Sequence, residues 1–203
     1  MAESIKIEIF RLKNADELTQ ALADPDSRMD TGSGAAATAA LAAALLKRAA
    51  ALTAKALPEH ERAAYILRNA EILRTYMVHL IDEDVKARSP LRRALREGDE
   101  RNIEAARQPA AAISGEVINM MGQALELGRE LSEVCPKEAL HYLGEFAELA
   151  MSAIRCARIY IVDMADKCAD DTYRFVVRRE NEITLKSCTE CAGAIIAKVE
   201  SAI

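Results

Sequence analysis

The sequence has no tryptophan, and aromatic residues make up only 4% of its 203 residues. Its core must therefore be built mainly from Ala, Leu, Ile, Val and Met, within a hydrophobic fraction of 51%. Small side chains let helices approach one another closely. The scarcity of aromatic and alternating segments, which are typical of strands, argues against a sheet larger than an N-terminal fragment.

Features of several other protein classes are also missing. The N-terminus, Met1-Ala2-Glu3-Ser4, lacks the basic and apolar regions of a secretory signal, so we expect a cytoplasmic protein. The number of cysteines is odd, so we expect no structural disulfides. No second pair accompanies Cys188-Thr-Glu-Cys191, and a lone Glu138/His141 pair lacks the partners of a di-iron site, so no metal site is predicted.

Charge and hydropathy exclude two kinds of partner. The net charge is −5, and no basic block is present to neutralise a row of phosphates, so nucleic acid is not an expected partner. The longest apolar stretch, Ala35 to Leu46, is interrupted by Lys47 and Arg48. It is shorter than the roughly 20 residues that a membrane span needs, so no membrane partner is expected.

Helical periodicity dominates the rest of the chain and predicts an all-α, up-and-down bundle of long helices in a single domain, residues 1–203. We expect breaks at Pro58, at Ser89-Pro90 and at Cys135-Pro136, and uninterrupted helix from Lys137 to Arg179. Because Ala-rich, aromatic-poor helices bury little area per residue, we also expect a homodimer or a higher symmetric oligomer.

The segment Asp30-Thr31-Gly32-Ser33-Gly34 directly precedes the Ala-rich helix. Glycines allow close backbone approach, and the free N–H groups of a helix start favour an anion. The alternative is an ordinary capped helix start, with Asp30, Thr31 or Ser33 as the N-cap.

A second cluster of interest is acidic. Asp82 and Asp84 are two residues apart, so they cannot share one helix face. One of them, next to Leu80 and Ile81, would have a raised pKa and serve as a proton shuttle. The alternative is a solvated acidic end of a surface helix.

These segments resemble those of the cyclodeaminase/cyclohydrolase family. Residues 28–37 are similar to its Thr-Pro-Gly-Gly-Gly-Gly/Ser turn and small-residue helix, Ala51-Leu52-Thr53 to its Asn-Leu-Thr, and residues 80–87 to its Ile-Asp-Glu-Asp-Ala/Val-Glu-Ala segment. The resemblance implies an all-helical, dimeric enzyme acting on one-carbon units of tetrahydrofolate. Its members hydrolyse methenyltetrahydrofolate, or release ammonia from formiminotetrahydrofolate while closing the methenyl ring.

The resemblance also implies roles for individual residues. The ligand, a tetrahydrofolate derivative bound as substrate with no tightly bound cofactor, would contact the segment of Asp30, Thr31, Gly32, Ser33 and Gly34. Asp84 would be the main acid/base group and Asp82 the alternate. Lys55 would be the nearest cation, and Asp163, at the family's late asparagine position, would face the pocket.

A second hypothesis is a helical bundle that has lost the chemistry and serves as a binding or assembly subunit. Thr31 and Ala51 differ from the family pattern, and only Lys55 remains of a lysine run. In addition, the Asp30 carboxylate would oppose an anion beside the turn.

Overall fold

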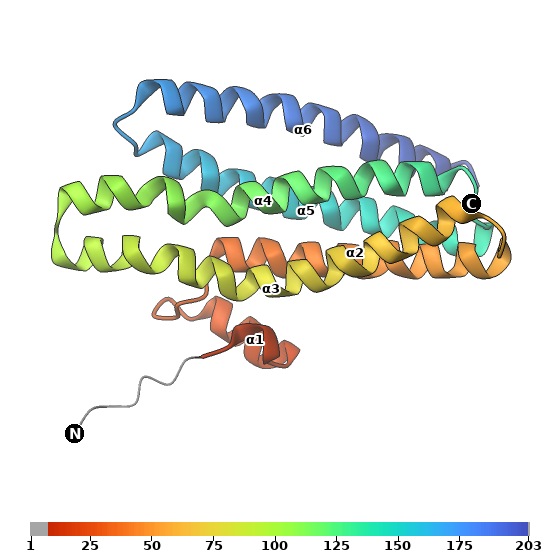
Figure 1. Ribbon diagram of the computed structural model, residues 1–203, viewed down its shortest axis with the longest axis horizontal. Helices are drawn as coiled ribbons and strands as arrows, with labels where there is room; N and C mark the ends of the chain where they lie inside the picture. Colours follow the sequence, from red (N-terminus) through yellow and green to blue (C-terminus); the bar gives the residue numbers. More distant parts are fainter. Residues whose placement is uncertain (1–7, 203) are drawn as a thin grey trace.

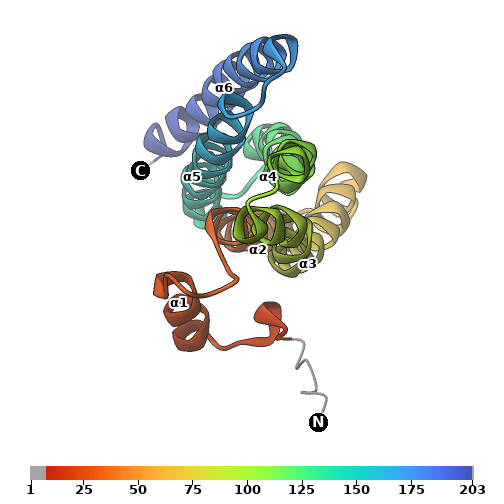
Figure 2. The same ribbon diagram turned by 90° about the vertical axis from the view of Figure 1, so that its left-hand side faces the viewer.

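A computed structural model describes residues 8–202 of the chain. In chain order its elements are η1 (Phe10–Leu12), α1 (Ala15–Ala23), α2 (Thr31–Ala56), α3 (Glu61–Glu97), α4 (Glu100–Ser132), α5 (Lys137–Asp166) and α6 (Asp171–Glu200). Helices α2 to α6 run up and down along one long axis, and α1 lies outside them (Figures 1 and 2). No strand occurs in the described residues, which confirms the all-α prediction. The N-terminal fragment with alternating apolar residues, Ile5-Lys6-Ile7-Glu8-Ile9, lies outside the described residues up to Ile7.

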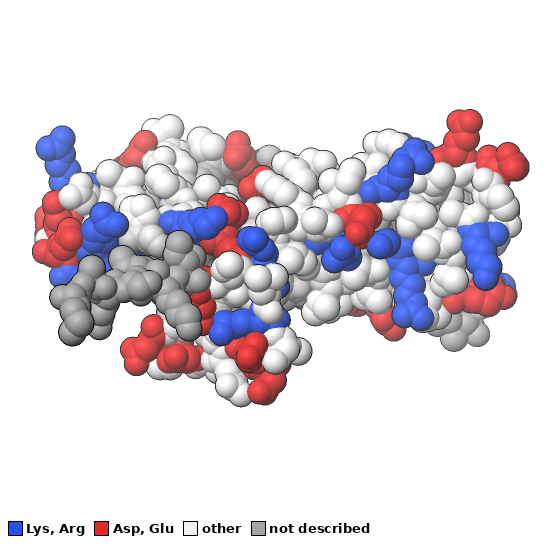
Figure 3. Space-filling model, turned by 60° about the horizontal axis from the view of Figure 1, so that its bottom comes forward, with Lys and Arg blue, Asp and Glu red and all other residues white. Residues whose placement is uncertain are grey.

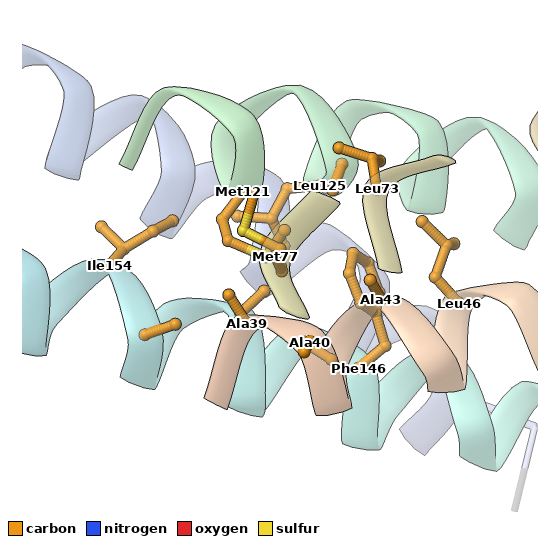
Figure 4. Close-up of a cluster of buried hydrophobic side chains, with 14 of the residues drawn as sticks. Ala39, Ala40, Ala43, Leu46, Leu73, Met77, Met121, Leu125, Phe146 and Ile154 are labelled. Carbon is orange, nitrogen blue, oxygen red and sulfur yellow. The ribbon is translucent and has the colours of Figure 1, made fainter. Parts of the chain in front are cut away.

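The alanines of α2 form the centre of the packing. Ala39, Ala43 and Leu46 have no exposed surface, and α2 packs against both α3 and α5. Figure 4 shows larger side chains from the other helices, among them Met77 and Phe146, filling the space beside these alanines. Small residues on one helix and large ones on its neighbours therefore give the close packing that the composition predicts.

Helix α2 also has the length and hydropathy of a membrane span. Its most apolar window of 18 residues, within Thr31–Ala56, has a mean hydropathy of 1.4. Half of that window is buried inside the bundle. A core helix with apolar residues on several faces has this same composition.

The predicted break at Ser89-Pro90 is wrong, because α3 continues through Pro90 to Glu97. An interior proline removes one backbone hydrogen bond and costs about 3 kcal/mol. Packing beyond the proline offsets this cost: Leu91 is buried in a small cluster with Tyr160 and Met164 of α5. Residues on both sides of Pro90 therefore share one continuous helix.

The chain differs from prediction in two other places, the start of α3 and the break before α6. The third helix begins after Pro58, where the His60 ring accepts a hydrogen bond from the Ala63 N–H at 3.2 Å. The expected uninterrupted helix after Lys137 ends at Asp166, and Asp170 caps α6 by accepting from the Thr172 and Tyr173 N–H groups. In both places a side-chain cap determines the start of the helix, and single caps are difficult to distinguish from other polar residues in a sequence.

We predict opposite effects of alanine at two helical glycines. A Cβ atom at Gly128 of α4 would lie 2.4 Å from Cε1 of Phe146, a ring with no exposed surface. Gly128→Ala should therefore lower the free energy of unfolding by about 1–3 kcal/mol through overpacking. The matched control, Gly193→Ala in α6, meets no atom within 4 Å and should stabilise the protein by about 0.5–1 kcal/mol. Urea titrations of both variants check this, and equal stabilities would contradict it.

Candidate functional site

The glycine-containing segment forms the first turn of α2, and Asp30 is its N-cap. The Asp30 carboxylate accepts a hydrogen bond from the Thr31 N–H at 2.6 Å. The backbone carbonyl oxygen of Asp30 accepts one from the Gly34 N–H at 3.0 Å. Asp30 is thus the residue, among the three predicted, that caps the helix. The positive end of the α2 dipole lies at this turn.

Asp84 lies behind this turn and has no exposed surface. Its Oδ2 accepts hydrogen bonds from the N–H and Oγ–H of Ser33, both at 2.9 Å, and its Oδ1 has no hydrogen-bond partner in the described residues. Burial raises the pKa of Asp84, although Arg88 and Ser33 act in the opposite direction. Asp84 therefore joins α3 to the start of α2.

Gly32 makes this junction possible. A Cβ atom at residue 32 would lie 2.0 Å from Oδ1 of Asp84, so no other residue fits there without movement of the carboxylate. Gly32 and Ser33 are both buried. They serve the contact between α2 and α3, whereas the sequence predicted contact with a ligand.

Asp82 anchors the N-terminal segment to the bundle. Its Oδ1 accepts from the Phe10 N–H at 2.7 Å, and its Oδ2 lies 3.0 Å from Nη1 of Arg11. The side chain of Asp82 is 8% exposed. Asp82 therefore has a structural role. It does not lie at the solvated end of a helix, and it does not line the cavity described next.

A cavity of about 570 Å³ lies in front of the turn, between α1, the start of α2, and parts of α3 and α5. Asp30, Thr31 and Gly34 line it, as predicted for ligand-facing residues. Its other lining residues come mainly from α1, the loop before α2, and α5: Leu22, Asp24, Pro25, Ser27, Met29, Ala35, Thr38, Arg92, Cys156 and Ile159. Lysines, arginines and carboxylates are interspersed over the face that carries α1, without an extended patch of one sign (Figure 3).

The negative charge of Asp30 is compensated by two arginines of α3. Arg88 forms an ion pair with Oδ2 of Asp30, and Nη2 of Arg92 lies 3.8 Å from the same oxygen. Although burial opposes ionisation of Asp30, hydrogen bonds from Arg88 and Thr31 outweigh it and hold its pKa below the usual value. The pair with Arg88 therefore offsets the negative charge that Asp30 places beside the turn.

Two predicted residues are not brought into the cavity. Lys55 lies in the last turn of α2, and 24 residues of helix separate it from Thr31 by roughly 36 Å. Asp163 is half exposed and pairs with Lys167 at 2.6 Å. It follows the cavity residue Ile159 by one helical turn, but it is not itself part of the lining.

The site includes residues that the sequence reasoning did not select. The Arg88 guanidinium lies 4.6 Å above the Tyr160 ring, and Arg92 and Cys156 line the cavity. The spacing of four between Arg88 and Arg92 would have placed both on one helix face. The break expected at Ser89-Pro90 concealed that signal.

The cysteines and histidines form no metal site in the described residues. Cys188 and Cys191 are free and buried, as small hydrophobic side chains are. Across residues 8–202, no group of three or more His, Cys, Asp or Glu side chains is placed to hold a metal ion.

Comparison with known families now assigns the chain. The model of the formiminotransferase-cyclodeaminase family matches residues 14–182, which include the α2 turn, the acidic segment and both arginines. The chain belongs to this family. The match confirms the resemblance carried by residues 28–37 and 80–87.

Among solved structures, the fold of this family member is similar to that of formiminotetrahydrofolate cyclodeaminase from Thermotoga maritima. The TM-score is 0.86 with 19% identity, over 94% of this chain and 97% of the other. At this identity, the match supports the fold alone. A sequence search of curated proteins finds no match.

We predict that Asp84→Asn stabilises the protein at neutral pH. The pKa of Asp84 is raised above the usual 3.8 in the folded state, so its contribution to stability is fully present below the unfolded-state pKa and is lost as pH rises through the folded-state pKa. An amide keeps an acceptor for Ser33 and cannot ionise. The advantage of the variant should therefore be small near pH 4 and larger at pH 7, as measured by urea unfolding.

Asp82→Asn is the control for this experiment. It removes the charge from the pair with Arg11 and should be destabilising at pH 7. A stability difference between Asp84→Asn and wild type that does not change with pH would contradict the raised pKa.

Proposed function

We propose that the chain binds a one-carbon derivative of tetrahydrofolate in the cavity at the start of α2, as an enzyme of folate one-carbon metabolism. The observation that carries the proposal is the position of the cavity: Asp30, Thr31 and Gly34 belong to the turn that the family resemblance associates with folate. The family match over residues 14–182 supports the same ligand class. The volume of about 570 Å³ is within the usual range for small-molecule sites.

The preferred activity is cyclodeamination of formiminotetrahydrofolate. In that reaction the attacking nitrogen forms the ring-closing bond to the carbon of the protonated formimino group and passes its proton to the formimino nitrogen. The bond from the carbon to that nitrogen then breaks and releases ammonia. Hydrolysis of methenyltetrahydrofolate instead adds water to an amidinium-like carbon. Both reactions involve a cationic carbon, which an ionised carboxylate nearby stabilises.

Asp30 and Asp84 have different roles in this proposal because they lie on different sides of the turn. Asp30 provides an ionised carboxylate on the cavity wall, held in an ion pair with Arg88 that lowers its pKa. Asp84 lies behind the turn, and we propose that it positions the Asp30 segment through Ser33. In this proposal Asp84 does not contact the ligand.

The alternative function, a non-catalytic binding or assembly subunit, is favoured by one observation. Asp84, whose raised pKa suits a proton shuttle, has no exposed surface. The pKa of Asp30, the carboxylate of the turn that does line the cavity, is lowered. Such a subunit would have retained the fold and the cavity without turnover.

We predict that folate binding protects Cys156 from thiol reagents. Cys156 lines the cavity and is exposed, whereas Cys168, Cys188 and Cys191 are buried and Cys135 is half-buried. Saturating 5-formyltetrahydrofolate should slow modification of Cys156, followed by mass spectrometry, about tenfold or more. Gly34→Val should weaken this protection, because its branched side chain enters the cavity. The control, Gly193→Val, places the same side chain far from the cavity lining.

Activity assays on the same protein preparation distinguish an enzyme from a binding subunit. Ammonia release from formiminotetrahydrofolate supports cyclodeaminase activity, and loss of methenyltetrahydrofolate absorbance alone supports hydrolysis. Protection without either reaction supports the binding subunit. Absence of protection at millimolar folate would overturn the proposed site.

We also propose that the chain forms a homodimer. Leu41 is 62% exposed and lies one turn beyond the cavity residue Thr38, and Ile159 at the cavity is 68% exposed. An apolar surface of this kind is typical of an interface. Sedimentation should give twice the 22.2 kDa chain mass, and Leu41→Glu should yield monomers while the control Ile183→Glu on α6 does not. A wild-type monomer at micromolar concentration would contradict this.

A further inference from the structure

We infer that Arg92 is the anion-binding residue of the cavity and that it takes a carboxylate of the ligand. The identity of that ligand rests on the proposed function. Arg92 lines the cavity, and its side chain is 27% exposed. Its closest contact with a carboxylate of residues 8–202 is the 3.8 Å to Asp30, which is too long for a hydrogen bond.

Asp30 does not neutralise the charge of Arg92, because it is already paired with Arg88. The Arg88 guanidinium forms the closer ion pair with Oδ2 of Asp30, stacks on Tyr160, and is only 11% exposed. Asp30 and Arg88 thus compensate each other. One uncompensated positive charge, on Arg92, remains at this wall.

Other charged groups near the cavity do not neutralise Arg92. Asp84 lies behind the turn, and burial favours its protonated form. Asp24 lines the cavity from the end of α1, where it is exposed and its field is screened by solvent. Of the carboxylates that line the cavity, Asp30 is paired with Arg88 and Asp24 is solvated, so the positive charge of Arg92 remains available to a ligand.

The rest of the lining indicates what kind of anion fits. Leu22, Pro25, Met29, Ala35 and Ile159 give the cavity a mainly apolar surface. A planar guanidinium binds a carboxylate through two parallel hydrogen bonds. The site therefore suits a ligand with an aromatic body and a carboxylate at one end, and the benzoylglutamate end of a folate has this chemistry.

The test compares 5-formyltetrahydrofolate with its glutamyl dimethyl ester, in which methyl esters replace both ionised carboxylates, by calorimetry. Wild type should bind the acid about 10- to 100-fold more tightly than the ester, the usual range for a hydrogen-bonded charge. Arg92→Gln should remove this preference and leave affinity for the ester unchanged. Arg92→Lys should retain part of it. The control, Arg96→Gln, alters an exposed arginine one turn further along α3 and should behave as wild type.

A second set of variants tests the charge pairing. Arg88→Met should free Asp30 to pair with Arg92 and thereby weaken binding of the acid, even though Arg92 is still present. Adding Asp30→Asn should restore that binding. Circular dichroism verifies that each variant is folded.

The outcomes separate this inference from the proposed function. If wild type binds neither ligand, the proposed function itself fails. If wild type binds both ligands equally, or if Arg92→Gln weakens both equally, the site remains a folate site but Arg92 does not recognise the carboxylate, and the inference is overturned.

Discussion

The contact between Asp84 and the first turn of α2 is the interaction on which the candidate site depends. Through it, α3 satisfies the Ser33 N–H and Oγ–H groups at a helix start, where N–H groups have no partners within the helix. The same contact requires a glycine at position 32. Glycine at a helix start usually indicates that a ligand approaches the backbone closely. At position 32, glycine is instead required by the packing of α2 against α3. The turn is held rigidly from behind, and only Asp30, Thr31 and Gly34 face the cavity.

Asp82 and Asp84, the two aspartates of the acidic segment, make different contacts because they point in different directions from α3. The sequence correctly predicts that Asp82 and Asp84 diverge, because two residues on a helix span about 200°. It does not indicate what each one meets. Asp82 contacts η1, more than seventy residues earlier in the chain, and Asp84 contacts Ser33, about fifty residues earlier. Such long-range partners are set by the tertiary fold, and no local pattern contains them.

The helical architecture was predictable because its signal is repeated many times. Apolar residues recur at helical spacing along every long helix, so an error at one position has little effect on the assignment. Boundaries depend on single residues, and there the predictions were less accurate. Pro90 predicts a break because the cost of an interior proline is a local property, whereas the burial of Leu91 that offsets this cost depends on α4 and α5.

That one boundary also determined how much of the site could be found. With a break at Ser89-Pro90, Arg88 and Arg92 belong to different segments and have no defined relation. In a continuous α3 they lie one turn apart on the same side as Asp84, and both approach Asp30. The uncompensated charge at the cavity thus results from a proline that the helix tolerates. Because the packing of Leu91 and the position of Arg92 depend on the same stretch of helix, the stability of α3 beyond Pro90 and the electrostatics of the cavity are coupled.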